Sequence, residues 1–311
     1  MTRVAAVDCG TNSVRLLVTD VEGSHKQDMH RETRIVRLGQ GVDRTGELAP
    51  DAVERTRKAL SAYARTCDRL HVEATRMVAT SATRDARNRG DFVRMVVEVL
   101  GVEPEVVSGD EEAALSFDGA TRDLDPADAP FLVMDIGGGS TELVLGSTSV
   151  EAARSVDVGC VRLTERHLTS DPPTAAQVAA AVADLDAAVA LVRAVVPVER
   201  ARTAVGLAGS VTTVAAIALG LREYDAERIH RTRLPAARVQ EVTTLLLRST
   251  HAERAAMPVM HPGRVDVIGA GALVLATLMD RLALAEVLVS EADILDGIAW
   301  SCAPASTKGP T

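Results

Sequence analysis

One segment occurs twice in the sequence and places an aspartate, glycines and a hydroxyl side chain at the same spacing. Residues 6–18 read AVDCGTNSVRLLV, and residues 133–145 read VMDIGGGSTELVL. Each copy has an apolar segment, the pattern D-x-G-x-x-S and a second apolar segment, which predicts a β-hairpin with a glycine-bearing turn. Glycine lets the backbone approach a ligand closely, and consecutive amides in such a turn can bind an anion. The repeat therefore predicts two phosphate-binding turns.

A carboxylate ends the first strand of each hairpin. Asp8 and Asp135 can be ordinary turn residues that cap a strand end. They can also hold Mg²⁺ directly or through water, because that ion prefers oxygen ligands and keeps several waters. Two copies in register favour the second interpretation.

Three glycine and hydroxyl segments are candidates for phosphate binding. The run of three glycines followed by Ser140 is the strongest, because a tight turn alone does not require three. A later pair precedes an expected helix, where helix capping is the alternative role. The residues expected to bind phosphate through these segments are Asn12, Ser13, Gly137, Gly138, Gly139, Ser140, Gly209 and Ser210.

Composition excludes several classes of protein. The 311 residues carry a net charge of −9, are 47% hydrophobic and contain few aromatic residues, which argues against a nucleic-acid-binding surface. The four cysteines stand at no metal or disulfide spacing, and the histidines at no ligand spacing. With no signal peptide and no run of about 18 apolar residues, we expect a cytoplasmic protein that contacts no membrane.

The length favours two domains, and the repeat predicts two equivalent α/β lobes with a cleft between them. We expect a boundary in the Pro- and Asp-containing stretch 122–130, giving domains 1–124 and 125–311. Within the first domain we expect a third strand at 34–38, and within the second a helix at 264–284. The last helix is expected to pack back on the first domain, and the tail 304–311 to lack structure.

Two further motifs complete a recognisable set. Thr80–Ala86 reads TSATRDA and Ser108–Ala113 reads SGDEEA, and with the two hairpins they come in the order found in the Ppx/GppA phosphatases. The sequence resembles this family from about residue 4 to about residue 300. The resemblance implies duplicated RNase H-like lobes of the actin/Hsp70/sugar-kinase superfamily. It also implies a short two-domain form, and Leu295 stands where the family commonly has an arginine.

The resemblance also implies roles for individual side chains. Glu112 matches the catalytic base, although a glutamate at a helix start can serve only the helix dipole. Arg84, expected in a loop, matches a phosphate ligand, although a surface arginine is usually a solvated charge. Asp135 and Glu142 match residues associated with the metal. The predicted set is thus Glu112, Asp8 and Arg84 for catalysis, and Asp135, Glu142 and Asp8 for Mg²⁺, with Mn²⁺ as a substitute.

The activity implied is release of terminal orthophosphate from inorganic polyphosphate, with a preference for short chains because the C-terminal extension of larger members is absent. The shared motifs leave open a guanosine pentaphosphate 5′-phosphohydrolase. Two other classes are a kinase-like enzyme that uses ATP and a catalytically silent sensor of polyphosphate or alarmone. A homodimer is expected, since family members often form one.

Overall fold

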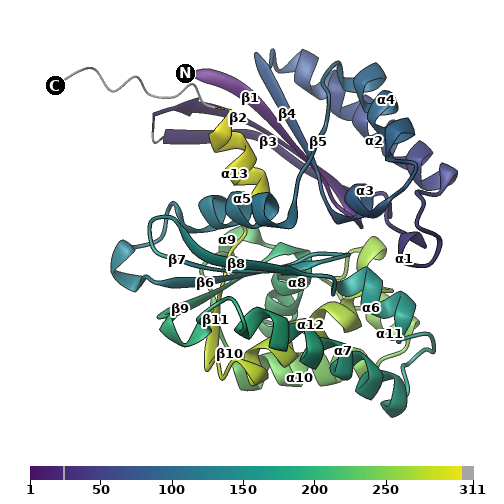
Figure 1. The fold of residues 1–311 in the computed structure, drawn as a ribbon, viewed down its shortest axis with the longest axis vertical. Helices are drawn as coiled ribbons and strands as arrows, with labels where there is room; N and C mark the ends of the chain where they lie inside the picture. The colour runs from purple at the N-terminus through teal and green to yellow at the C-terminus, as the bar shows by residue number, and fades with distance from the viewer. Residues whose placement is uncertain (24, 303–311) are drawn as a thin grey trace. The chain divides into compact units, whose positions relative to one another are not determined.

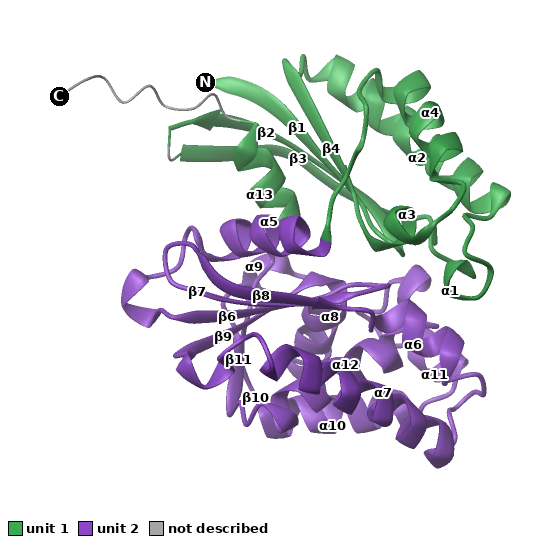
Figure 2. Ribbon diagram, in the orientation of Figure 1, with its two compact units in different colours: residues 1–108, 294–311 green, residues 109–293 purple. Residues whose placement is uncertain are grey.

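The computed structural model describes residues 1–23 and 25–302. The chain forms two compact units (Figure 2). Unit 1 contains residues 1–108 and the chain from Ile294 onward, and unit 2 contains Gly109–Asp293. The domain limits 1–124 and 125–311 differ from these packing units and stay a prediction.

Unit 1 is built on a sheet with the strand order β3-β2-β1-β4-β5. Its first three strands are antiparallel neighbours, and β4 and β5 add in parallel beyond β1. This arrangement follows from the hairpin repeat and the alternating helices and strands after it. The strands are β1 (Thr2–Cys9), β2 (Ser13–Glu22), β3 (His25–Ile35), β4 (Ala74–Ala79) and β5 (Glu105–Val106).

The core of unit 1 lies between its sheet and the helices α2 and α4. Alternate β1 residues, Ala5, Val7 and Cys9, share a cluster with Leu60 of α2 and Phe92 of α4. The last helix, α13, contacts β1, β2 and β4 (Figure 1). The helices are α1 (Val42–Thr45), α2 (Pro50–Arg69), α3 (Ser81–Asp85), α4 (Arg89–Leu100) and α13 (Ile294–Ser301).

Unit 2 repeats this sheet and extends it by one strand. The order β8-β7-β6-β9-β11-β10 matches unit 1 strand for strand up to β11, which confirms the predicted duplication and the RNase H-like lobes. The strands are β6 (Phe131–Ile136), β7 (Thr141–Gly146), β8 (Val150–Val156), β9 (Thr203–Leu207), β10 (Arg233–Pro235) and β11 (Glu286–Val289).

Helices cover both faces of the second sheet (Figure 1). Phe131 and Val133 pack with α5, whereas Leu132 and Met134 pack in the larger cluster on the other face. The helices are α5 (Gly109–Thr121), α6 (Cys160–Arg166), α7 (Ala175–Arg193), α8 (Ala208–Ala218), α9 (Ala226–Ile229), α10 (Ala236–Arg248), α11 (His251–Ala255) and α12 (Ile268–Arg281). Short 3₁₀ turns lie at η1 (Pro126–Asp128), η2 (Val198–Arg200) and η3 (Pro262–Arg264).

Two predictions from the sequence were wrong, and a third concerns residues outside the part of the chain that the structure describes. The third strand is His25–Ile35 rather than 34–38, because this exposed edge strand is polar and lacks an apolar alternation. The helix expected at 264–284 begins only at Ile268, after a 3₁₀ turn that ends at Arg264. The tail 304–311 lies outside the described residues.

Helix α7 is long and apolar enough to cross a membrane by length and composition. It is nevertheless part of unit 2, where Leu185 and Val189 join the main core cluster. Its opposite face is exposed and carries alanines at a heptad-like spacing. We call these residues the α7 alanine face: Ala176, Ala180, Ala183, Ala187, Ala190 and Ala194.

Candidate active site

Helix α5 places Glu112 against the second sheet. Ala113 and Phe117 anchor the helix in the core, and Glu112 and Ser116 lie one turn apart on a buried face. Glu112 is only 8% exposed, whereas its neighbour Glu111 is exposed. Burial therefore distinguishes the two glutamates, which the motif alone leaves ambiguous.

Asp135 and Glu142 lie directly opposite each other on the antiparallel strands β6 and β7. Side chains alternate along a strand, so Asp135 shares the α5 side of the sheet with Phe131 and Val133. The Ser116 hydroxyl donates to Asp135 Oδ2 at 2.6 Å, which confirms that α5 faces this carboxylate. The structure thus brings Asp135 and Glu142 together beneath α5.

The electrostatics of this site are dominated by like charges. Burial raises the pKa of the Glu142 carboxyl well above its ordinary value, and the nearby Glu112 and Asp135 raise it further. Hydrogen bonds from Ser155, at 2.7 Å, and Ser140 act in the opposite direction, because they favour the ionised form. Three buried acidic groups that influence one another are typical of a site that receives a cation or moves a proton.

The glycine turn lies at the end of β6, next to these acidic groups. The Gly137 amide donates to the Ser140 carbonyl at 3.1 Å, which closes the hairpin. A Cβ on Gly137 would lie 3.0 Å from that same carbonyl oxygen, so the turn is tight. Ser140 is buried and bonds to Glu142. The turn and the carboxylates therefore form one continuous polar site.

The Gly209–Ser210 segment lies beside this turn, because β9 is the parallel neighbour of β6. Ala208, the first residue of α8, follows β9 directly and has a φ of 66°, a left-handed conformation that is strained for a residue with a side chain. Ser210 bonds to the Cys160 side chain, and the Cys160 amide donates to the Gly137 carbonyl at 3.0 Å. Cys160 therefore links the two phosphate-binding candidates.

Sequence reasoning missed Arg264, which lies directly over Gly209. Its guanidinium donates to the Gly209 carbonyl and, at 3.0 Å, to the Thr213 hydroxyl. A Cβ on Gly209 would overlap the guanidinium, so this close approach requires glycine. Arg264 comes from a 3₁₀ turn more than fifty residues along the chain, and no local pattern indicates that it returns here.

In unit 1 the corresponding residues gather at the carboxyl ends of β1 and β4. The Arg15 guanidinium donates to Asp8 Oδ2 at 2.7 and 2.9 Å, so this carboxylate already has a cationic partner. The Thr11 and Ser81 hydroxyls lie 2.8 Å apart and tie the turn that contains Asn12 to α3.

Arg84 lies in helix α3, not in the loop expected from the sequence. Its Nη1 donates to the Val107 carbonyl at 3.1 Å. The preceding Thr83 has a buried hydroxyl with no hydrogen-bond partner in the part of the chain that the structure describes. Such a group costs free energy unless a ligand or water satisfies it. Unit 1 therefore brings Asp8, Asn12 and Arg84 to one end of its sheet.

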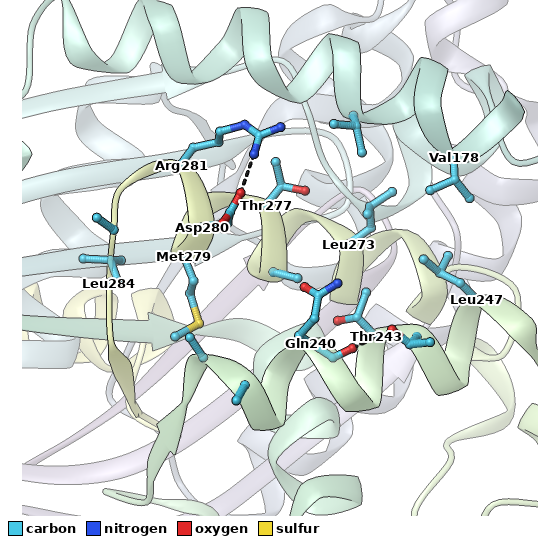
Figure 3. Close-up of a pocket in the computed structure, with 16 residues that line it drawn as sticks. Val178, Gln240, Thr243, Leu247, Leu273, Thr277, Met279, Asp280, Arg281 and Leu284 are labelled. Carbon is cyan, nitrogen blue, oxygen red and sulfur yellow. Dashed lines mark hydrogen bonds and ion pairs between the residues drawn. The ribbon is translucent and has the colours of Figure 1, made fainter. Parts of the chain in front are cut away.

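A groove of about 760 Å³ lies elsewhere in unit 2, between α7, α10 and α12 (Figure 3). Val178, Leu247 and Leu273 line it, while Asp280 and Arg281 at one end pair with each other. None of the residues predicted to act on phosphate contributes to this groove.

Comparison with known proteins identifies the family of this chain. A model described as the Ppx/GppA phosphatase family matches residues 17–305. The chain belongs to this family. Exopolyphosphatase 2 of Mycobacterium tuberculosis is 52% identical over 316 residues, which cover 97% of this chain and 99% of the relative.

Two solved structures show the same fold. A crystal structure of an exopolyphosphatase-like protein has a TM-score of 0.93 and 42% identity, over 96% of this chain and 98% of its own. The PPX-GPPA enzyme of Aquifex aeolicus has a TM-score of 0.81 and 30% identity, over 96% and 99% of the two chains. The fold class predicted from the repeat is therefore confirmed.

Ppx/GppA phosphatases generally use a divalent metal ion. The carboxylate oxygens of Asp135 and Glu142 suit a hard cation, which would also offset the charge repulsion that raises the pKa of Glu142. Yet no group of three His, Cys, Asp or Glu residues within the described chain is placed to hold a metal by itself. The residues fit an ion held by one or two carboxylates, with water and phosphate oxygens as its other ligands.

Proposed function

We propose that this chain is an exopolyphosphatase, which hydrolyses the terminal phosphoanhydride bond of inorganic polyphosphate and releases orthophosphate. The observation that carries the proposal is the buried Glu112 beside Asp135, Glu142 and the glycine turn. A relative that is 52% identical over nearly the whole chain is named an exopolyphosphatase, which supports the same substrate class.

Glu112 acts as the general base in this proposal. Its carboxylate accepts a proton from a water molecule as that water attacks the terminal phosphorus, and the shortened polyphosphate leaves with the bridging oxygen. Bulk water has little access to Glu112, because this residue lies on the buried face of α5. Ser116, which bonds to Asp135, fixes that carboxylate relative to Glu112 on the same helix.

The glycine turn and the Gly209–Ser210 segment bind phosphate oxygens through backbone amides and hydroxyls. Asn12, Ser13 and Arg84 of unit 1 are proposed phosphate ligands, and Asp8 is proposed to orient water or the metal. We propose Mg²⁺ as the cofactor, with Mn²⁺ as a substitute, held by Asp135 and Glu142. When bound, the ion neutralises charge on the transferred phosphoryl group.

The proposal includes a preference for short chains, since the chain resembles the short form of the family. It also includes a cytoplasmic location, no contact with nucleic acid or membrane, and a homodimer. The exposed α7 alanine face supports the homodimer.

The decisive experiment measures orthophosphate release with Mg²⁺ from short polyphosphate, long polyphosphate, guanosine pentaphosphate and ATP in parallel. Glu112→Gln keeps the size of the side chain but removes the base, so we expect kcat to fall by about 10²–10⁴-fold. Glu111→Gln is the matched control, because Glu111 is adjacent and exposed, and it should retain near-normal activity.

Each result decides between functions. Faster release from short polyphosphate than from the other substrates supports the proposal. Release mainly from guanosine pentaphosphate moves the chain to the alternative hydrolase. Binding without release from any substrate identifies a sensor, and equal losses in the Glu111 and Glu112 variants remove Glu112 from its role as base.

A further inference from the structure

The three glycines of the turn after β6 can adopt more backbone conformations than the one that a phosphate-binding site requires. Three consecutive glycines can direct their peptide groups either way, because they lack the side chains that restrict other residues. An anion is bound only when successive amides converge on one side of the turn. Some other part of unit 2 must therefore fix the orientation of these peptide groups.

The start of helix α6 provides that constraint. The amide of Cys160 donates to the Gly137 carbonyl at 3.0 Å, and the amides of Val161 and Arg162 donate to the Gly138 carbonyl at 2.9 and 3.1 Å. These are first-turn amides, which have no partner within a helix. The residue before α6, Gly159, provides no side-chain cap. The carbonyl groups of the glycine turn therefore cap helix α6, and the first amides of α6 fix the orientation of those carbonyl groups.

The third carbonyl of the turn is held by a side chain. Arg162 Nε donates to the Gly139 carbonyl at 2.7 Å. In a planar trans peptide, the carbonyl oxygen and the amide of the next residue point in opposite directions. Holding the carbonyls of residues 137–139 toward α6 therefore directs the amides of residues 138–140 away from it. The described residues offer no backbone acceptor to the Gly138 and Gly139 amides.

We propose that Arg162 is a positioning residue, which orients the Ser140 amide toward phosphate by holding the Gly139 carbonyl. This inference rests on the proposed function of the glycine turn as a phosphate-binding site. Arg162 acts through the turn and is not assigned a contact with substrate. Gly159 also helps to position the turn, because a Cβ at this residue would lie 2.5 Å from the Gly138 oxygen and displace it.

A pair of variants separates positioning from simple charge attraction. Arg162→Gln and Arg162→Met both remove the positive charge, but only glutamine can donate a hydrogen bond to the Gly139 carbonyl. Loss of one donor to a developing negative charge costs about 10²–10³-fold in kcat, so we expect Arg162→Met to approach this loss. We expect Arg162→Gln to retain at least about ten times the kcat of Arg162→Met.

Gly159→Ala provides an independent perturbation that changes no charge. We expect it to lower kcat as Arg162→Met does, and the melting temperature of every variant shows whether it folds. Orthophosphate binding without metal, measured by calorimetry, should weaken in Arg162→Met and Gly159→Ala and be retained in Arg162→Gln.

The outcomes distinguish this inference from the proposed function. Equal kcat and equal orthophosphate affinity in Arg162→Gln and Arg162→Met would overturn the inference. Activity restored by Arg162→Lys, or wild-type activity lost in proportion to added salt, would then identify a charge effect. A wild-type chain that releases no orthophosphate from polyphosphate would instead overturn the proposed function. A folded Gly159→Ala variant with normal kcat would also contradict the positioning role.

Discussion

At the scale of single residues, the acidic groups under α5 are arranged for function at a cost in stability. Glu112, Asp135 and Glu142 are buried, and the first two lie close enough to Glu142 to raise its pKa. Like charges in a buried site destabilise the folded state unless a proton or a cation neutralises them. A divalent ion would therefore improve both catalysis and stability.

Removing the Glu142 charge should stabilise the metal-free protein. Because the folded pKa of Glu142 lies above its unfolded value, the folded chain resists ionisation of this group, and wild-type stability declines as the pH rises through the folded pKa. At pH 8 in chelator we expect Glu142→Gln to raise the free energy of unfolding by at least about 1 kcal/mol, because the amide places no charge in the buried site. Urea unfolding measures this difference.

The advantage of Glu142→Gln should shrink as the pH falls toward about 4.3, the ordinary glutamate value, because the wild-type carboxyl becomes protonated. Orthophosphate release should fall in the same variant, since a proposed metal ligand is lost. Equal stability of the two proteins at pH 8 would show that the charge repulsion is relieved in another way.

The Thr83 hydroxyl is a second buried group that lowers the stability of the folded chain. It is fully buried next to Arg84 and has no hydrogen-bond partner within the described residues. We expect Thr83→Val to raise the free energy of unfolding by about 1 kcal/mol, the lower end of the cost of an unsatisfied polar group. If this hydroxyl meets phosphate, KM for polyphosphate should rise several-fold.

Thr19→Val is the matched control for Thr83, because the Thr19 hydroxyl is also buried but donates to the Gln27 carbonyl at 2.9 Å. That variant should lose about 1 kcal/mol rather than gain it. Destabilisation of both variants would mean that Thr83 is satisfied in solution. Unchanged KM in Thr83→Val would exclude a contact with substrate.

At the scale of elements, α13 belongs to unit 1 although almost two hundred residues of unit 2 precede it in the chain. Leu295 is buried, so the position where the resemblance expects an arginine serves packing here. Asp296 is also buried and pairs with Lys26 at 2.6 Å and Arg31 at 2.7 Å, both on β3. This ion-pair cluster fixes the last helix to unit 1.

Asp296→Asn should destabilise unit 1, because it leaves two cations facing a neutral amide. Breaking a fully buried pair costs about 3–5 kcal/mol, and the partial exposure of Arg31 lowers our expectation to about 2 kcal/mol. Asp28→Asn is the control, because Asp28 contacts the same two cations but is exposed, and we expect it to lose less than about 1 kcal/mol. Urea unfolding of both variants tests the difference, and equal losses would contradict it.

The elements that could be predicted from the sequence are those with a strong local signal. The two hairpins were found because β1 and β6 are apolar and end in a repeated turn. The sequence does not predict the position of strand β3, because its residues are mostly polar and exposed. It predicts a loop in place of α3, because five residues carry little helical periodicity. Burial separates Glu112 from Glu111, and only the tertiary fold brings Arg264 to Gly209.

At the scale of the whole molecule, the exposed α7 alanine face is the surface on which we base the proposed homodimer. Its alanines follow heptad-like a and d positions on the side of the helix opposite Leu185 and Val189. Small residues let two helices approach to about 8 Å. In an antiparallel pair of α7 helices centred between Ala187 and Ala190, the g positions place Asp186 opposite Arg193 of the second copy. The two charges are complementary, although within the chain Asp186 pairs with Arg281 at 2.7 Å and Arg193 donates to the Arg281 carbonyl at 3.1 Å.

This register predicts which substitutions break the proposed homodimer. Ala187→Glu and Ala190→Glu place charges at the centre of the paired helices, so we expect each variant to be monomeric at concentrations where the wild type is dimeric. Ala176→Glu is the matched control, because it lies on the same face but beyond the overlap of the two helices, and it should remain dimeric.

Light scattering coupled to size exclusion measures the mass of each protein. A monomeric wild type would refute the homodimer, and dimeric central variants would place its interface elsewhere. Glutamate costs an exposed helix only a few tenths of a kcal/mol relative to alanine, so loss of the dimer in the central variants alone is attributable to the interface.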